Sequence, residues 1–116
     1  MRDIIFRGKN KSGMVHTGNL YSDDKTYIIV NDSAYDIVSF IEVDPDSVGQ
    51  MTDIDDVDGN PIFEGDLVFQ RAVLVEDNLQ FSGTVIFSEG QWLIDNGEEA
   101  IPLWTEHREN KIIGGN

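Results

Sequence analysis

The chain of 116 residues contains no cysteine, three prolines, two histidines and only eight lysines and arginines. Without cysteine it can form neither a disulfide nor a thiolate zinc site, so its stability must come from apolar packing and backbone hydrogen bonds, as suits a reducing cytoplasm. No apolar run approaches the roughly 20 residues that a membrane-spanning helix needs. The N-terminal segment, MRDIIFRGKN, has charges on both sides of a short apolar patch, which is typical of a strand and not of a signal peptide.

Positive charge is scarce, and it is unevenly distributed. The net charge is −14, yet residues 1–25 carry five cations against three carboxylates, a balance of 5 − 3 = +2. Residues 26–107 carry one cation against eighteen carboxylates, giving −17, and residues 108–116 contribute +1. Because nucleic-acid phosphates are ordinarily met by clustered Lys and Arg, we expect no direct binding of nucleic acid. The acidity then serves solubility, or it forms a surface that imitates a polyanion or recruits a basic partner.

Short segments of alternating apolar and polar residues predict about nine strands. The predicted strands lie at residues 4–7, 14–20, 27–30, 37–43, 62–75, 79–87, 91–94, 100–103 and 112–113, with a break or bulge at Pro45 before residues 48–51. A short helix capped by Asp32 or Ser33 is the alternative at residues 34–41, but the density of Ile, Val, Phe and Tyr favours a strand. The Asn96-Gly97 pair predicts a hairpin between residues 92–94 and 100–103.

The segment DIDDVDGNP at residues 53–61 predicts a turn region, because Asp and Asn bond their own backbone and Gly and Pro fix bends. This acidic turn divides the chain, which we expect to form one domain over residues 1–116. An N-terminal β subdomain would span about residues 1–51. Small twisted antiparallel sheets would close into an SH3-like barrel over about residues 62–114. The predicted fold class is therefore mainly β.

Several segments resemble the YopX family of phage and prophage proteins, in the same order along the chain. They are VDPDSVGQ at residues 43–50, DG at 58–59 followed by IFEGDLV at 62–68, GTV at 83–85 and IIG at 112–114, after the opening MRDIIFR at 1–7. The chain departs from the family pattern at Asp53, where a glycine is usual, and it ends at Asn116, where relatives tend to continue. The second departure predicts a missing C-terminal tail. The resemblance implies a phage or prophage origin and a bacterial host. It implies no activity, because the family has no settled one.

The segment FEGDLV at residues 63–68 is the most specific part of this resemblance, and it has a physical reading of its own. In a strand, Phe63 and Leu67 would share one face, and Glu64 and Asp66 would share the other. Gly65 would then allow a close backbone approach at a barrel corner, where one strand bends to serve two sheets. The two carboxylates would accept hydrogen bonds across that corner.

The acidic turn also resembles a calcium loop in part of its spacing. The residues concerned are Asp53, Asp55, Val57, Asp58, Gly59 and Glu64. An EF-hand loop that began at Asp53 would need an oxygen ligand at position five and glycine at position six, and these are Val57 and Asp58. We therefore expect a solvated acidic turn and assign no metal ligands.

Catalytic motifs are absent from the sequence. His16 and His107 are far apart, and neither has a nucleophile at a signature spacing. No phosphate loop or dinucleotide fingerprint occurs, so we assign no catalytic, cofactor-binding or metal residues and expect a protein that is not an enzyme. Trp92 and Trp104, at the ends of predicted hairpin strands, are expected in the core.

These observations favour a non-enzymatic accessory protein that acts through protein–protein contacts in the bacterial cytoplasm, without contact with a membrane. Its partners would be an unknown host or phage protein and other copies of itself. Unpaired strand edges favour a homo-oligomer, with residues 4–7 and 112–114 as the candidate edges. The alternative is an acidic nucleic-acid mimic that sequesters a host DNA-binding protein. Its carboxylates would be Asp44, Asp46, Asp53, Asp55, Asp56 and Asp58.

Overall fold

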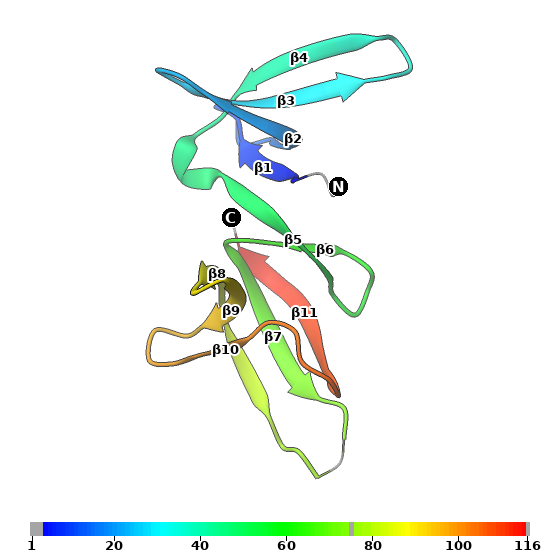
Figure 1. Ribbon diagram of the computed structural model, residues 1–116, viewed down its shortest axis with the longest axis vertical. Helices are drawn as coiled ribbons and strands as arrows, with labels where there is room; N and C mark the ends of the chain where they lie inside the picture. Colours follow the sequence, from blue (N-terminus) through cyan, green and yellow to red (C-terminus); the bar gives the residue numbers. More distant parts are fainter. Residues whose placement is uncertain (1–3, 75, 116) are drawn as a thin grey trace. The chain divides into compact units, whose positions relative to one another are not determined.

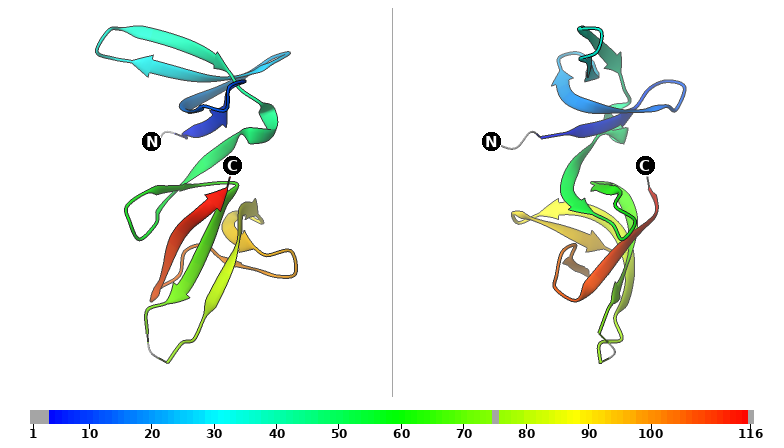
Figure 2. Two further views of the ribbon diagram at one scale, coloured as in Figure 1. Left: turned by 180° about the vertical axis from the view of Figure 1, so that it is seen from behind. Right: turned by 90° about the vertical axis from the view of Figure 1, so that its right-hand side faces the viewer.

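The computed structural model describes residues 4–74 and 76–115, and this part of the chain is built almost wholly from strands. It contains eleven strands and one short 3-10 helix: β1 Phe6–Lys9, β2 Val15–Ser22, β3 Thr26–Asp32, β4 Ile37–Glu42, η1 Pro45–Ser47, β5 Gly49–Asp55, β6 Pro61–Phe63, β7 Asp66–Ala72, β8 Gln80–Ser88, β9 Gln91–Asp95, β10 Ala100–Pro102 and β11 Arg108–Gly115 (Figure 1). The mainly-β prediction is confirmed. The chain divides into two compact units, residues 1–51 and 52–116 (Figure 2).

The first unit is an antiparallel sheet in the order β4-β3-β2-β1. β1 also pairs with the start of β5, where Phe6 lies opposite Gln50. The strand predicted at residues 37–43 is confirmed, because β4 pairs with β3 along its whole length, and the helical alternative is wrong. Ile28 and Val43 form the buried centre of this unit.

The second unit is an antiparallel sheet in the order β10-β9-β8-β7-β11. Alternate residues of its strands point to one side and form the core, as period-two patterning requires. The core residues are Ile62, Val68, Phe81, Val85, Ile94 and Leu103. The predicted pairing of residues 92–94 with 100–103 is confirmed, since Ile101 lies opposite Ile94.

The strand β8 is shared between two neighbours. Its first half, as far as Thr84, pairs with β7, and its second half, from Thr84 onward, pairs with β9. A glycine precedes this change of partner: a Cβ on Gly83 would lie 2.5 Å from the carbonyl oxygen of Asp95. The second sheet therefore bends at β8.

The predicted closure into an SH3-like barrel is not confirmed. β10 and β11 are the two edges of the second sheet, and no ladder joins them within residues 52–74 and 76–115. What covers the outer edge of β11 is the turn after β5. Val57 donates its N–H to the carbonyl of Asn110 (2.8 Å), and Asp56 accepts the N–H of Ile112 (3.2 Å).

The segment at residues 63–68 is not one continuous strand, as had been predicted. Gly65 has a φ of 93°, and it lies in a turn between β6 and β7. Because of this turn, Phe63 and Leu67 do not share one face as predicted. Val68 is fully buried, while Leu67 is exposed. Asp66 is buried and accepts the N–H of Phe63 at 2.8 Å, which closes the turn. Val75, the predicted end of this strand, lies outside the described residues.

Two further predictions need correction. The acidic turn is shorter than residues 53–61, because β5 continues to Asp55. Asp53, which stands where the family usually has glycine, has a φ of 65°, a conformation that glycine adopts without strain. Trp92 packs against the core as predicted, but Trp104 is 64% exposed. Trp104 lies two residues beyond the β9–β10 ladder, which ends where Pro102 lies opposite Leu93.

Candidate functional site: an exposed aromatic face on an unprotected edge

The register of β2, β3 and β4 brings aromatic side chains together on one face of the first unit. Tyr21 lies opposite Tyr27, and Phe40 lies opposite Ile29. Cross-strand partners in an antiparallel ladder project to the same side of the sheet. The three ring centroids are 5.8 to 6.4 Å apart. With Val38, two positions before Phe40 on β4, these residues form what we call the aromatic face: Tyr21, Tyr27, Ile29, Val38 and Phe40.

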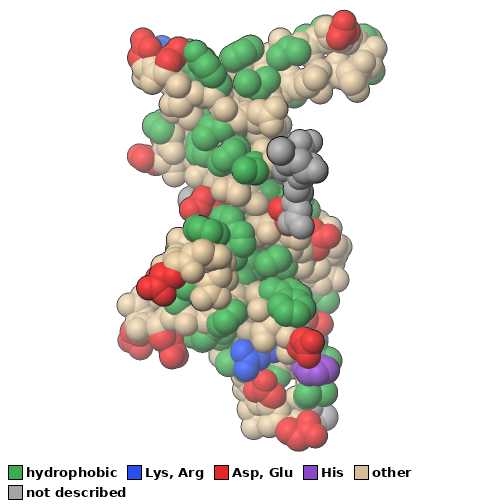
Figure 3. Space-filling view, in the orientation of Figure 1, with side chains coloured by type: hydrophobic (Ala, Val, Ile, Leu, Met, Phe, Trp, Pro, Cys, Tyr) green, Lys and Arg blue, Asp and Glu red, His purple; other side chains and the backbone are tan. Residues whose placement is uncertain are grey.

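The aromatic face is open to solvent. Phe40 is 57% exposed and Val38 is 54% exposed, whereas Ile28, on the opposite face of the same sheet, is fully buried. Hydrophobic side chains reach the surface in the region of β2, β3 and β4 (Figure 3). An antiparallel sheet with one solvated face ordinarily places polar residues there. A contiguous apolar patch in that position is typical of an interaction surface.

β4 is the outer strand of this sheet, and the one charge within the strand is Glu42 at its end. Val43 donates its N–H to the carbonyl of Thr26 at 2.9 Å. The alternation of an antiparallel ladder then turns the backbone groups of Val38 and Phe40 away from β3. Natural edge strands prevent pairing with other chains by a charge, a proline or a bulge. The sequence IVSFI at residues 37–41 has neither charge nor proline, and its ladder with β3 is regular.

Of the two edges predicted from the sequence, one is wrong. Residues 4–7 are not an edge, because Phe6 and Arg7 of β1 pair with both β2 and β5. Residues 112–114 do lie in an edge strand, β11, but the Asp56 turn bonds part of that edge. The sequence predicted β4 as a strand but not as an edge, and it did not reveal the aromatic face. The sequence does contain a sign of them. At residues 27–30 and 37–41, apolar residues occupy both odd and even positions, so both faces of these strands are apolar.

The acidic turn is a structural element centred on a buried carboxylate. Asp56 is 7% exposed and accepts backbone N–H groups from Asp58 (3.0 Å), Asn60 (2.9 Å) and Ile112 (3.2 Å). Burial raises the pKa of Asp56, but these three donors and nearby Lys111 together outweigh it and lower the pKa below its usual value. The carboxylate therefore stays ionised and holds the turn against β11.

The other carboxylates that the sequence suggested for a nucleic-acid mimic differ in their surroundings. Asp58 is ion-paired with Lys111, and Asp44 accepts the N–H of Asp46 at the start of η1. Asp53 and Asp55 are exposed. In the part of the chain that the structure describes, no three Asp, Glu or His side chains are grouped so that they could hold a metal ion.

The two histidines are in different units. The His16 ring lies 3.3 Å from the side-chain amide of Asn10, and His107 is an exposed residue with a φ of 64°. His16 thus contacts the turn before β2, and His107 lies in the loop before β11.

The comparisons with known proteins agree with the resemblance seen in the sequence. The family model described as YopX protein matches residues 5–115, which is nearly the whole chain. Neither the curated proteins nor the solved structures contain a significant match. Within the described residues, no helix is long and apolar enough to cross a membrane. Because the family model matches nearly the whole chain, the chain belongs to the YopX family.

Proposed function

We propose that this protein is a non-enzymatic accessory protein of phage or prophage origin that acts through protein–protein contacts as a homo-oligomer in the cytoplasm of a bacterial host. The observation that carries the proposal is the unprotected β4 edge beside the exposed aromatic face. Pairing of β4 with β4 of a second copy would continue the sheet across a two-fold axis. It would satisfy outward-facing backbone groups and bring the side chains of Val38 and Phe40 into lateral contact with those of the second copy.

The pleat of the strand restricts how two copies can pair. The backbone groups that point outward belong to Val38, Phe40 and Glu42, and residues opposite each other across the new ladder must lie on the same face. A two-fold axis at Ser39 meets both conditions, because it places Val38 opposite Phe40 of the second copy. The aromatic faces of the two copies then form one continuous surface.

Charge at the strand ends is compatible with this arrangement. Glu42 at the end of β4 lies 3.5 Å from Lys25. In the antiparallel pair, this ion pair approaches Asp36 of the second copy, in the turn before β4. Lys25 can thus neutralise one carboxylate from each copy. Such exposed ion pairs contribute about 0 to 1 kcal/mol, so they select the register and the apolar contact supplies the affinity.

Static light scattering of paired variants tests the proposal. Val38→Pro removes an outward-facing N–H, and proline is tolerated in edge strands when its missing N–H faces solvent. Val38→Thr keeps both the branched shape and the N–H. We expect the wild type and Val38→Thr to have at least twice the 13.0 kDa chain mass and Val38→Pro to have the mass of one chain. A wild type that remains monomeric at about 100 μM would contradict self-association.

The nucleic-acid mimic is the second candidate, and the exposed positions of Asp46 and Asp55 support it. It receives less support than self-association, because Asp56 is used by backbone donors and Asp58 by Lys111. Salt distinguishes the two proposals. A mimic would capture a host protein at low ionic strength and release it at about 0.5 M NaCl, where the Debye length is ~4 Å, whereas oligomers joined through β4 would persist.

We also propose that the second unit is a partly open relative of the SH3-like barrel. The support is β8, which bends at Gly83 and Thr84 and serves two neighbouring strands. An experimental structure with a ladder between the edge strands of this sheet would establish the barrel, and edges that stay apart would reject it.

A further inference from the structure

The second unit has an open strand edge with a groove beside it. β8 pairs with β7 over Gln80–Thr84, but its pairing with β9 begins only at Thr84. The edge of β8 that faces β9 therefore has no ladder along residues 80–83 among the pairings of the described chain. A groove of about 820 Å³ runs along this stretch, bounded on one side by the turn at residues 95–97.

Backbone groups of β8 point into this groove. Ala72 donates its N–H to the carbonyl of Leu79 at 3.2 Å, which sets the alternation of the β7–β8 ladder. The backbone groups of Phe81 then face β7, and those of Gln80 and Ser82 face the groove. An extended segment of about four residues, ~13 Å long at 3.3 Å per residue, would match this edge.

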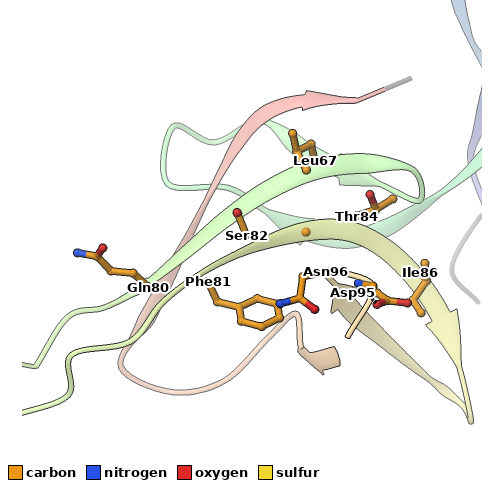
Figure 4. Close-up of a pocket in the computed structure, with 10 residues that line it drawn as sticks. Leu67, Gln80, Phe81, Ser82, Thr84, Ile86, Asp95 and Asn96 are labelled. Atoms are coloured by element: carbon orange, nitrogen blue, oxygen red, sulfur yellow. Dashed lines mark hydrogen bonds between the residues drawn. The ribbon is translucent and has the colours of Figure 1, made fainter. Parts of the chain in front are cut away.

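The side chains around the groove alternate in character. Ser82 and Thr84 project from one face of β8, and Phe81 projects from the other (Figure 4). Leu67 and Ile86 add apolar surface. A site of this kind takes main-chain hydrogen bonds from an added strand and receives its alternate side chains on the two faces.

The charge at the groove is acidic. Asp95 lies in the groove wall, and Glu98 and Glu99 follow in the adjoining turn. The cation on the neighbouring strand, Arg71 opposite Gln80, is ion-paired with Glu109. A polypeptide with positive charge is attracted to such a surface, and an acidic one is repelled. The charge therefore distinguishes a basic segment from a second copy of this acidic chain.

We propose that the open edge of β8 binds an extended, basic peptide segment of a partner protein by strand addition. The segment pairs with Gln80 and Ser82, its basic residues lie near the carboxylates of the β9–β10 turn, and its apolar residues lie over the groove face that carries Leu67 and Ile86. The site lies in the second unit, and its occupant is different from that of β4, so this inference does not depend on self-association.

Two-dimensional NMR with defined peptides tests the proposal. The probe is a six-residue peptide of alternating lysine and valine, and the control replaces each lysine by glutamate. We expect the basic peptide to shift the amide signals of Gln80, Ser82 and Gly97 saturably and the acidic peptide to shift none of them. Absence of saturable shifts, equal binding of both peptides, or shifts confined to β4 would each overturn the proposal.

Matched variants give the second part of the test. Gln80→Pro removes a groove-facing N–H at the first residue of β8, a position where proline is tolerated, and Gln80→Thr keeps it. We expect about tenfold weaker binding for Gln80→Pro and unchanged binding for Gln80→Thr. If Gln80→Pro does not fold, Glu98→Lys with Glu99→Lys takes its place, and the expected loss is again about tenfold. Wild-type affinity in the variant used would overturn the proposal.

Discussion

At the scale of single residues, Asp56 has the clearest structural role. Its carboxylate accepts three backbone N–H groups and connects the turn after β5 with β11. Asp56→Asn keeps one acceptor oxygen and places an amide donor against N–H groups. We expect a loss of about 1 to 3 kcal/mol in the free energy of unfolding at pH 7, measured by urea denaturation. Asp55→Asn, at an exposed neighbour, is the control and should change little.

The pH dependence of this effect follows from the pKa of Asp56. Because the folded state lowers that pKa, the stabilisation is fully present above the unfolded value of 3.8 and is lost as the pH falls through the lower folded value. The difference in stability between wild type and Asp56→Asn should therefore shrink below about pH 4. A difference that stays constant from neutral pH to the acid transition would contradict the assigned role of the charge.

Asp53 tests the cost of a left-handed backbone. With a φ of 65°, it occupies a region where a side chain other than Asn or Asp is strained. We expect Asp53→Ala to be about 1 kcal/mol less stable than Asp53→Gly, because both variants lose the carboxylate and only glycine adopts this φ freely. Chemical denaturation of the two variants measures this difference, and equal midpoints would show that the backbone relaxes.

At the scale of elements, the bend of β8 depends on a glycine. A Cβ on Gly83 would lie 2.5 Å from the carbonyl oxygen of Asp95 and 3.0 Å from the backbone nitrogen of Asn96. Backbone atoms cannot move aside like the end of a side chain, so Gly83→Ala must displace β9. We expect a loss of more than about 2 kcal/mol in stability, with Ser82→Ala as a nearly neutral control. Thermal unfolding of the two variants tests this, and a stable Gly83→Ala would place the bend elsewhere.

At the scale of the whole molecule, net charge opposes self-association. Each copy carries −14, so two copies repel each other at long range, and in the proposed oligomer the apolar β4 contact would have to outweigh this repulsion at short range. Raising NaCl from about 20 to about 200 mM shortens the Debye length from ~20 to ~7 Å and should tighten the oligomer. Sedimentation velocity over this range measures the effect. Dissociation on adding salt would mean that ion pairs between copies, and not β4, provide the affinity.

The sequence predicted most strands because their alternation is local information. The position of β4 and the hairpin at Asn96-Gly97 followed from residue types alone. The turn at Gly65 did not, because its flanking residues continue an apolar alternation and only the backbone φ separates β6 from β7. The aromatic face also escaped prediction, since Tyr21 and Phe40 meet only through the register of three strands. Closure of a barrel depends on long-range pairing, which residue types do not specify.

The proposed contact of two copies through β4 is tested most directly by an isotope-filtered NOE experiment. Equal amounts of 13C-labelled and unlabelled protein are mixed, and only contacts between copies are recorded. We predict cross-peaks between the methyl groups of Val38 and the ring protons of Phe40 from the second copy. An oligomer that gives no such cross-peaks, or whose intermolecular contacts arise from β11 instead, would contradict the account.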